Sequence, residues 1–583
     1  MLLIDVREAL LALAGMAFAY PWAALVLGRE RTPLLTVLTT LALSLGALTL
    51  GMLALLLLDA LRAGIVWIGM LVVFAAGMAL LIRRELLPRW RGRAGFRSAI
   101  TAARAHPLEA VALAIVVALL ALVTFNLLYW PFNADDAVSI YAMQSRVIVE
   151  TRALPDDDGL YEAYPMLVPL SYAYAHLVAG QVDEYLALGF AAALSIGAFG
   201  ATGALGATLY DRRTGLVAAL LLALTPVFVR WCGAGYTDVP AGFFTAMGAL
   251  FAWRLLQDGD GRDALLAGLM VGLAAWTKNS ALAMSVSLAV AVGYGMLPRL
   301  EGARLTVRHA ALAALGVLVT AGPWYIRNLS LIGRPVPPTV WADRAEPTVM
   351  NLVPLLTDLG LEGFFLPGAV MTLGAGLVIL EAFRLPGPQR DSARVLWIFA
   401  LPFAAAWWRL ASYELRFLMT ILPLAAVMGA RGVMRLGDWL PQLQGERARW
   451  MAMVAGAALL VALALPAARK SVQFKGEILR DPLMDDAERH RVTLGAVYDV
   501  ARYLDSLPAE GTILSDTYFL PFHVHSAQVV VGGLPRRDVL ARYSYLVLSP
   551  GSPLPGAMTA DDAALLVDMD GYRVYRVTYT PDS

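Results

Sequence analysis

The 583-residue chain has one cysteine and few charged residues. Cys232 has no partner for an internal disulfide, and a cysteine-rich zinc or iron–sulfur site is excluded. Only 16% of the residues are charged and 59% are hydrophobic, whereas soluble domains are about 25% charged. The net charge of +1 gives no field that would attract nucleic acid. The composition therefore predicts a membrane-embedded protein.

Apolar runs long enough to cross a bilayer recur throughout residues 1–467. A hydrocarbon core of about 30 Å needs roughly 20 apolar residues in one helix. By this measure the sequence predicts a polytopic α-helical membrane protein with about 14 transmembrane helices. The predicted spans are 8–28, 34–58, 64–82, 108–130, 186–209, 215–230, 240–257, 264–277, 281–297, 309–326, 363–383, 394–409, 416–434 and 450–467.

The charged residues of the short loops predict the orientation of these helices. Arginine fills every second loop, beginning with the run between residues 83 and 104, and basic loops face the cytoplasm. Acidic residues occupy the intervening loops, which therefore belong to the outer face. No basic region precedes the first apolar run, so we expect no cleaved signal peptide. Both ends of the chain are then expected on the outer face of the membrane.

Residues 468–583 are more polar and predict a separate extracytoplasmic domain. We expect helices near 482–507, 536–543 and 560–566 and strands at 512–515, 528–531, 545–548 and 572–577, an alternation typical of a small α/β domain. Residues 1–107 then supply extra N-terminal helices and a basic cytoplasmic loop. Residues 108–467 supply the transmembrane core, with a long first outer loop at 131–185.

Two adjacent carboxylates, Asp135 and Asp136, directly follow the fourth predicted span. The next residues, including Ile140, Tyr141 and Val147, form an amphipathic stretch that we expect to lie along the membrane interface. Partial desolvation there would raise the proton affinity of a carboxylate and suit it to act as a base. The alternative is a pair of exposed loop acids, or a charge that stabilises a helix N-terminus.

Four further motifs are predicted to reach the same outer face. They are GYTDVP with Asp238, WTKN with Lys278, GPWYIRN with Arg327, and YELRF with Glu414 and Arg416. Ionisable side chains at membrane depth are costly and usually line a polar cavity. The lysine and the two arginines would together suit a phosphate or pyrophosphate, because arginine offers a bidentate fork.

Each basic residue alone also has a structural explanation. Lys278 would extend its ammonium group to the membrane interface, Arg327 would cap a helix C-terminus, and Arg416 would pair with Glu414. Because the basic residues and the acid pair are all predicted on the same side of the membrane, the functional interpretation is favoured.

The order NADD, GYTDVP, GLAAWTKNS, PWYIRN and YELRF resembles the polytopic glycosyltransferases of the GT-C superfamily. The similarity is greatest to the branch that holds the lipid A aminoarabinose transferases and the bacterial relatives of protein O-mannosyltransferases. It covers residues 108–467 and an outer C-terminal domain such as these proteins often carry. The resemblance implies a GT-C-like fold and an inverting membrane enzyme, which passes a sugar from a polyprenyl-phosphate carrier to a lipid, glycan or protein acceptor.

The resemblance also implies roles for single residues. Asp135 and Asp136 match the acid pair of the first outer loop, where one acid acts as base or orients the acceptor, and Asp135 is favoured. Lys278, Arg327 and Arg416 match basic positions near the carrier phosphate.

Other acids match positions near the acceptor. Asp238 matches the second outer-loop acid of the family, and with Asp135 it would supply oxygen ligands for the divalent metal ion that some relatives use. Glu162, Tyr164 and Glu414 are expected close to the acceptor or to such a metal. The aminoarabinose branch carries a Glu-Lys-Pro element in the first loop, whereas residues 162–165 here read EAYP and lack the lysine.

Three histidines are weaker candidates for ligands. His176 lies on an aromatic-rich predicted helix and is expected to be a packing residue. His523 and His525 alternate, which predicts that they share one face of a strand, and without a third ligand we expect a surface role.

Two other classes of protein would share this composition. A transporter or flippase of lipid-linked glycan needs the same apolar bulk, but a transport path usually has polar residues near the middle of the bilayer, and here these are few. A non-catalytic assembly partner would bind through its outer domain.

Overall fold

The structure is a computed structural model of the chain. It describes residues 5–28, 32–86, 104–155, 160–297, 304–336, 342–348, 350, 363–439, 446–508, 511–532, 541–554 and 562–579. Most of the basic run at 83–104 and the acidic run at 156–158 therefore lie outside the described residues.

The three N-terminal spans that the sequence predicts are confirmed as helices. They are α1 (Val6–Ala17) with α2 (Tyr20–Leu27), α3 (Pro33–Leu57) and α4 (Ala63–Arg83). Asp5 and Glu8 form a capping box that satisfies the free amide groups at the start of α1. Pro33 begins α3, at a position where the missing N–H costs nothing.

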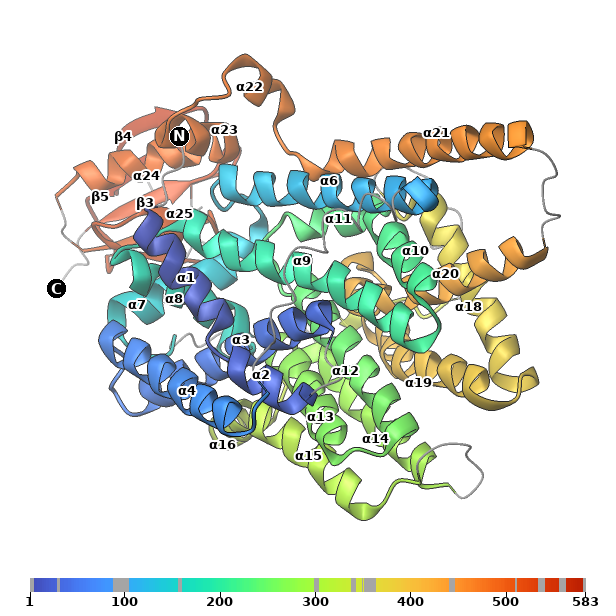
Figure 1. Cartoon of the computed structure of the whole chain (residues 1–583). Helices are drawn as coiled ribbons and strands as arrows, with labels where there is room; N and C mark the ends of the chain where they lie inside the picture. The colour runs from blue at the N-terminus through green and yellow to red at the C-terminus, as the bar shows by residue number, and fades with distance from the viewer. Residues whose placement is uncertain are drawn as a thin grey trace.

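The core is a bundle of helices, and the C-terminal domain lies at one side of it (Figure 1). Its elements are α6 (Pro107–Tyr129), η2 (Ala137–Ala142), α7 (Met143–Thr151), η3 (Leu160–Ala163), α8 (Leu167–Ala179), α9 (Glu184–Leu209), α10 (Arg212–Ala223), α11 (Pro226–Cys232), α12 (Asp238–Asp258), α13 (Gly261–Thr277), η4 (Asn279–Leu282), α14 (Ala283–Met296), α15 (Val307–Thr320), α16 (Gly322–Ile332), η5 (Ala342–Arg344), α18 (Phe365–Arg384), α19 (Gly387–Leu410), η7 (Leu415–Thr420), α20 (Leu422–Trp439) and α21 (Glu446–Ser471).

The number of helices that can cross a membrane is smaller than the sequence predicts. Within the described residues, nine helices are long and apolar enough, or up to 11 if two bent pairs count as spans. The bends are 78° between α10 and α11 and 60° between α15 and α16, and a proline in the first turn of α11 and of α16 explains the break. The predicted spans 264–277, 394–409 and 416–434 coincide with α13, α19 and α20, which are not among the candidates, so 14 spans are not confirmed.

The 131–185 segment is folded against the bundle and contains several short helices. Ile140 and Tyr141 are buried, so the stretch expected at the membrane interface instead packs into the protein. His176 of α8 is fully buried, and its ring is hydrogen-bonded to the Ser145 hydroxyl at 3.1 Å. It also accepts the amide hydrogen of Asp183 at 3.0 Å, which confirms the predicted packing role of this histidine.

The C-terminal domain contains a mixed five-stranded sheet with the strand order β2-β1-β3-β5-β4. Strands β1 to β3 are parallel, whereas β5 is antiparallel to β3 and to β4. The elements are α22 (Lys475–Arg480), α23 (Asp486–Leu494), α24 (Ala496–Ser506), β1 (Thr512–Ser515), α25 (Leu520–His523), β2 (Gln528–Val531), β3 (Tyr545–Leu548), β4 (Ala563–Met569) and β5 (Tyr572–Val577). All four predicted strands are confirmed.

Two of the predicted helices of this domain differ from the structure. Residues 560–566 were expected to be helical, but Ala563 begins strand β4, which pairs with β5 through a tight turn at Asp570 and Gly571. Both turn residues have positive φ, the conformation that short hairpins require. The helix expected near 482–507 is two helices separated at Gly495, and the helix expected at 536–543 lies largely outside the described residues.

The C-terminal domain packs against the 131–185 segment and the neighbouring helix ends (Figure 1). Arg146 of α7 donates to the carbonyl oxygens of Pro521 and Phe522 at 3.0 and 2.7 Å. The hydroxyl of Tyr185 donates to the Asp486 carboxylate at 2.7 Å. The domain therefore lies at the same end of the bundle as the acid pair that follows α6.

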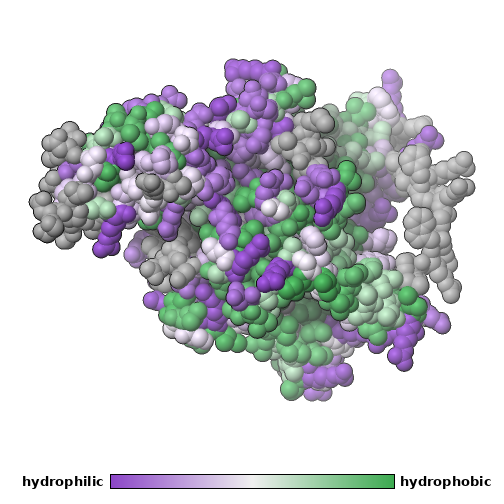
Figure 2. All heavy atoms as spheres, turned by 90° about the vertical axis from the view of Figure 1, so that its left-hand side faces the viewer, coloured by the Kyte–Doolittle hydropathy of each residue, from purple (hydrophilic) through white to green (hydrophobic). Residues whose placement is uncertain are grey.

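Apolar side chains cover parts of the outside of the bundle, as in helices that face lipid. Only 22% of the span formed by α4 and 11% of the span in α21 is buried. Figure 2 shows one face of the molecule, where apolar residues gather in the lower part and hydrophilic residues dominate the upper part.

Small residues allow helices α13 and α15 to approach closely. A Cβ atom on Gly268 would overlap the carbonyl oxygen of Ala313, and one on Gly316 would lie 2.5 Å from the amide nitrogen of Leu269. Such small residues let helix backbones touch where side chains would hold them apart.

Gly268→Ala is expected to destabilise the protein by about 1–3 kcal/mol, the usual cost of overpacking. Thermal unfolding of the purified protein in detergent would show a lower midpoint. Gly293→Ala on α14 is the matched control, because a Cβ there meets nothing within 4 Å. An unchanged midpoint for Gly268→Ala would contradict the close contact.

Candidate active site

Four charged side chains that the sequence predicts on one face meet at one end of the bundle. Asp136 precedes η2, Asp238 begins α12, Lys278 follows α13 and Arg416 lies in η7. Lys278 is hydrogen-bonded to Asp238. Arg416 Nη1 lies 2.9 Å from Asp136 Oδ2, and its Nε lies 3.8 Å from Asp238 Oδ2. We call these four residues the charged tetrad.

The helix ends favour the charges of the tetrad. Asp238 is the first residue of α12, where the helix dipole stabilises a negative charge. Lys278 immediately follows the last residue of α13, where the dipole stabilises a positive charge. The ion pair thus joins the start of one helix to the end of the next.

The tetrad is largely buried and is lined by aromatic rings. The side chain of Asp238 is 1% exposed, that of Lys278 14% and that of Arg416 16%. The Arg416 guanidinium lies 4.7 Å from the ring centre of Tyr236, and Lys278 Nζ lies 4.1 Å from that of Phe417. Removal of water strengthens both the ion pairs and these cation–π contacts.

Two tyrosines hold the segment that carries the acids. The amide of Asp136 donates to the hydroxyl oxygen of Tyr236 at 2.9 Å, and the hydroxyls of Tyr141 and Thr237 are hydrogen-bonded at 3.0 Å. Burial raises the pKa of both tyrosine hydroxyls, and the Asp136 carboxylate raises the pKa of each further. Both phenols are therefore neutral hydrogen-bonding groups. The sequence motifs did not identify them, although Tyr236 stands within GYTDVP.

Asp135 differs from its neighbour. Its side chain is exposed, and its carboxylate makes no ion pair or hydrogen bond with the residues that the structure describes. The Asp136 carboxylate, by contrast, is held by Arg416. The acid pair therefore consists of one engaged and one free carboxylate.

A second charged pair joins the 131–185 segment to α16. Arg327 Nη2 lies 3.3 Å from Glu162 Oε1, and its guanidinium lies 4.6 Å from the ring of Trp324. The indole of Trp324 and the amide of Asn328 donate to the carbonyl oxygen of Ala163 at 3.2 and 3.1 Å. The residues of the EAYP stretch are thus fastened to the helix that carries Arg327.

Some of the structural alternatives for the basic residues do not match these contacts. Glu414 accepts the backbone amide hydrogen of Arg416 at 3.0 Å, while the guanidinium reaches the aspartates. Lys278 pairs with Asp238 and does not extend outward alone. Tyr164 is half-buried and packs against the hydrophobic core of the bundle.

Asp135 and Asp238, the predicted metal ligands, are poorly suited to bind a divalent cation together. One oxygen of Asp238 is bound by Lys278 and the other lies near Arg416. A metal ion at this carboxylate would lie beside two positive side chains, which it would repel.

One family model matches part of the chain. Residues 163–326 match the family of dolichyl-phosphate-mannose-protein mannosyltransferases. This segment contains Asp238 and Lys278 of the tetrad and ends one residue before Arg327. No curated protein matches the chain by sequence.

Three solved structures are similar to the chain at low sequence identity. ArnT from Cupriavidus metallidurans, crystallised with undecaprenyl phosphate, is 15% identical, with a TM-score of 0.56 over 79% of this chain and 97% of that one. The oligosaccharyltransferase of Archaeoglobus fulgidus is 14% identical, with a TM-score of 0.44 over 75% and 68% of the two chains. The mycobacterial arabinofuranosyltransferase AftD is 15% identical, with a TM-score of 0.49 over 82% and 40%.

The match to ArnT over nearly its whole length shows that the chain has the fold of the polytopic GT-C glycosyltransferases. The predicted resemblance to this class is confirmed. Within the class, the family match and the likeness to ArnT agree with the branch of the aminoarabinose transferases and the protein O-mannosyltransferases.

Asp238→Asn is expected to destabilise the protein by about 3–5 kcal/mol, because it leaves Lys278 and Arg416 buried without their common partner. Thermal unfolding in detergent would show a markedly lower midpoint. Asp258→Asn, an exposed acid at the other end of α12, is the control and should change stability by less than about 0.5 kcal/mol. Equal effects of the two changes would mean that the tetrad does not stabilise the fold.

Proposed function

We propose that the chain is a GT-C glycosyltransferase that moves a sugar from a polyprenyl-phosphate carrier to a hydroxyl group of a lipid, glycan or protein acceptor. The observation that carries this proposal is the cluster of ion pairs that Asp136, Asp238, Lys278 and Arg416 form. The unpaired carboxylate of Asp135 directly precedes this cluster in the chain. Ion pairs that merely stabilise a bundle would not need an unpaired acid directly before Asp136 in the chain. The GT-C fold, shared with an enzyme crystallised with undecaprenyl phosphate, supports the same class of donor.

The donor phosphate would bind at Lys278 and Arg416, with Arg327 as a third cation. Arginine and lysine stabilise the charge that develops on a phosphate leaving group. Each of these side chains keeps N–H groups beyond those that face the aspartates and Glu162, since lysine carries three and arginine five. Because the carrier is a lipid, its phosphate would enter from the side of the bilayer.

Asp135 would act as the general base, because it is the carboxylate of the pair that no cation occupies. It would accept the proton of the acceptor hydroxyl while the oxygen attacks the anomeric carbon. The bond from that carbon to the phosphate oxygen breaks, and polyprenyl phosphate leaves with the electron pair. Attack from the side opposite the leaving group inverts the anomeric centre.

The remaining acids would position the cations. Asp136 and Asp238 hold Arg416, and Asp238 also holds Lys278, while Glu162 holds Arg327. Tyr164 and Glu414 belong to the segments that carry these residues and are proposed to border the acceptor.

The reaction would take place on the outer face of a bacterial inner membrane. The arginine-rich loops support this orientation, and the C-terminal domain, at the same end as the tetrad, would then be extracytoplasmic. The proposed organisation is 1–107 as extra helices and a basic loop, 108–467 as the catalytic core and 468–583 as the outer domain.

Asp135→Asn is expected to lower sugar transfer about 10²- to 10⁴-fold, the usual contribution of a general base. The assay is transfer of labelled sugar from undecaprenyl-phosphate-linked donors to an added acceptor in liposomes. Asp343→Asn, which alters an exposed acid, should leave transfer unchanged. Transfer at the wild-type rate by Asp135→Asn would refute this role, and movement of lipid-linked sugar without transfer would favour a flippase.

Lys278→Gln is expected to weaken binding of undecaprenyl phosphate about 10- to 150-fold, which corresponds to loss of one hydrogen bond to a charged group at about 1.5–3 kcal/mol. Binding can be measured by titration of the detergent-solubilised protein with the labelled lipid. Lys475→Gln, which alters a half-buried lysine that donates to the carbonyl oxygen of Arg469 in the C-terminal part of the chain, is the matched control. Equal affinities of the two variants would exclude Lys278 from the donor phosphate site.

A further inference from the structure

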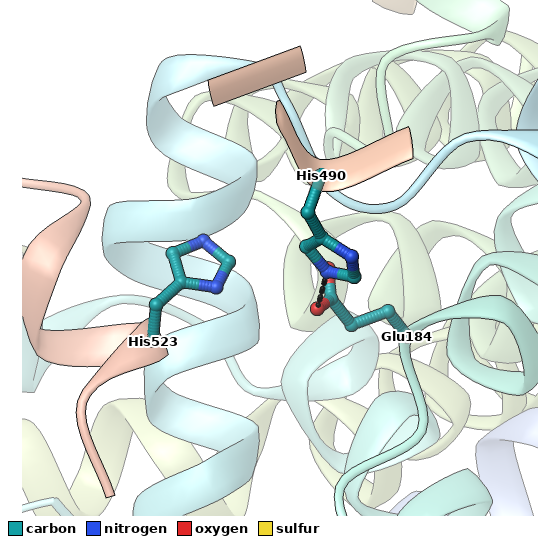
Figure 3. Close-up of side chains that lie close together, drawn as sticks. All are labelled: Glu184, His490 and His523. Atoms are coloured by element: carbon teal, nitrogen blue, oxygen red, sulfur yellow. Dashed lines mark hydrogen bonds and ion pairs between the residues drawn. The ribbon is translucent and has the colours of Figure 1, made fainter. Parts of the chain in front are cut away.

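A second cluster of ionisable side chains lies between the helical bundle and the C-terminal domain. Glu184 begins α9, His490 lies on α23 and His523 ends α25. One ligand atom from each residue lies within 4.8 Å of the others. Figure 3 shows the Glu184 carboxylate and both rings converging from these three elements. Among the described residues, this is the one group of three such side chains close enough to hold a metal ion.

The hydrogen bonds of His490 and Glu184 to the backbone direct one ligand atom of each residue toward the other. His490 Nδ1 donates to the carbonyl oxygen of Asp486 at 2.8 Å, so its Nε2 faces Glu184 Oε1 at 3.0 Å. The other oxygen of Glu184 accepts the amide hydrogen of Phe132 at 2.8 Å. A histidine whose second nitrogen donates to a backbone carbonyl is the usual arrangement in metal sites.

His523 provides the independent sign of a missing partner. Its side chain is 7% exposed, and its Nε2 is buried without a hydrogen-bond partner among the described residues. A buried polar atom left unpaired costs about 1–3 kcal/mol. The expected surface role of this histidine is therefore wrong, since His523 is buried at the end of a short helix, whereas His525 is exposed.

We propose that Glu184, His490 and His523 bind a zinc ion or a similar borderline divalent cation. Two imidazole nitrogens and one carboxylate oxygen are ligands that Zn²⁺ prefers, with bonds of about 2.0–2.2 Å. Ligand atoms around a tetrahedral ion with such bonds lie about 3.3 Å apart. A small rotation of the rings would bring the three atoms to that separation, and a fourth position stays open for water.

The ion would join three parts of the chain that are distant in sequence. Glu184 belongs to the helical bundle, and the two histidines belong to the C-terminal domain. The same carboxylate also holds the backbone of Phe132, three residues before Asp135. The site would thus fix the domain to the bundle and stiffen the segment that leads to the acid pair, independently of the reaction proposed above.

Without a metal, a protonated His490 would pair with Glu184. Burial favours the neutral ring, but the hydrogen bond to Glu184 raises the pKa of His490 to about 9. This ion pair would still leave His523 Nε2 unpaired. The two alternatives differ in their response to a chelator.

The test uses the full chain, purified in detergent through an affinity tag that contains no histidine. After dialysis against Zn²⁺ and removal of excess metal, mass spectrometry of the elements should find about one zinc per chain, as expected for one three-ligand site. A chelator should lower the thermal midpoint, and Zn²⁺, but not Mg²⁺, should restore it. A metal-free protein whose midpoint ignores both chelator and Zn²⁺ would overturn the proposal and support the ion pair.

Variants identify the ligands. His523→Gln should weaken zinc binding by more than the 10- to 100-fold that loss of an outer partner costs, whereas His525→Gln, two residues along the same segment, should bind as the wild type does. Equal zinc content in the two variants would also overturn the proposal. If His523→Gln fails to fold, Co²⁺ titration of the wild-type protein provides the second measurement. Intense visible absorption of a tetrahedral centre supports the site, and its absence refutes it. Neither readout depends on sugar transfer.

Discussion

Neutralisation of charge inside an apolar bundle is the constraint on which the structure of the site depends. A buried cation without a partner is too costly to keep, so Arg416 can lie among Trp231, Tyr236 and Phe417 only because Asp136 and Asp238 face it. Those two acids come from segments about a hundred residues apart. The guanidinium therefore connects the first outer segment, the start of α12 and η7, and it sets the positions of Lys278 and Asp135 indirectly.

The sequence predicted much of this arrangement because charge is scarce in a membrane chain. The side of each loop, read from its arginines, indicated that Asp136, Asp238, Lys278 and Arg416 would share one face, and the structure brings them together. The sequence did not predict which acid pairs with which base, because the side of the membrane on which a loop lies does not determine the distances between its side chains and those of other loops. An ion pair between Arg416 and its near neighbour Glu414 was one alternative. Glu414 instead accepts the backbone amide hydrogen of Arg416, and the guanidinium pairs with Asp136.

The predictions that the structure contradicts are those in which the local sequence pattern favours one structure and the tertiary contacts favour another. Residues 560–566 contain alanine and leucine, which favour helix, but pairing with β5 across the Asp570-Gly571 turn makes them a strand. The stretch with Ile140 and Tyr141 has an apolar face typical of an interfacial helix, but it packs against α8, the aromatic-rich helix predicted around His176. His523 was expected at the surface because its partners, 33 and 339 residues away in the chain, cannot be inferred from spacing alone.

The contact between Glu184 and His490 also constrains the order in which the protein can be completed. The two residues are 306 positions apart, and ribosomes add about 5–20 residues per second, so Glu184 is made about 15–60 s before its partner exists. During that time the helices from α9 to α21 are made, and the carboxylate that holds Phe132 faces no histidine. The last hundred or so residues thus supply His490 and His523, which complete a site whose carboxylate, Glu184, lies in the first third of the chain. A chain that ends between α21 and His490 would contain the described helices of the bundle but would leave Glu184, which holds the backbone of Phe132 three residues before the acid pair, without its histidine.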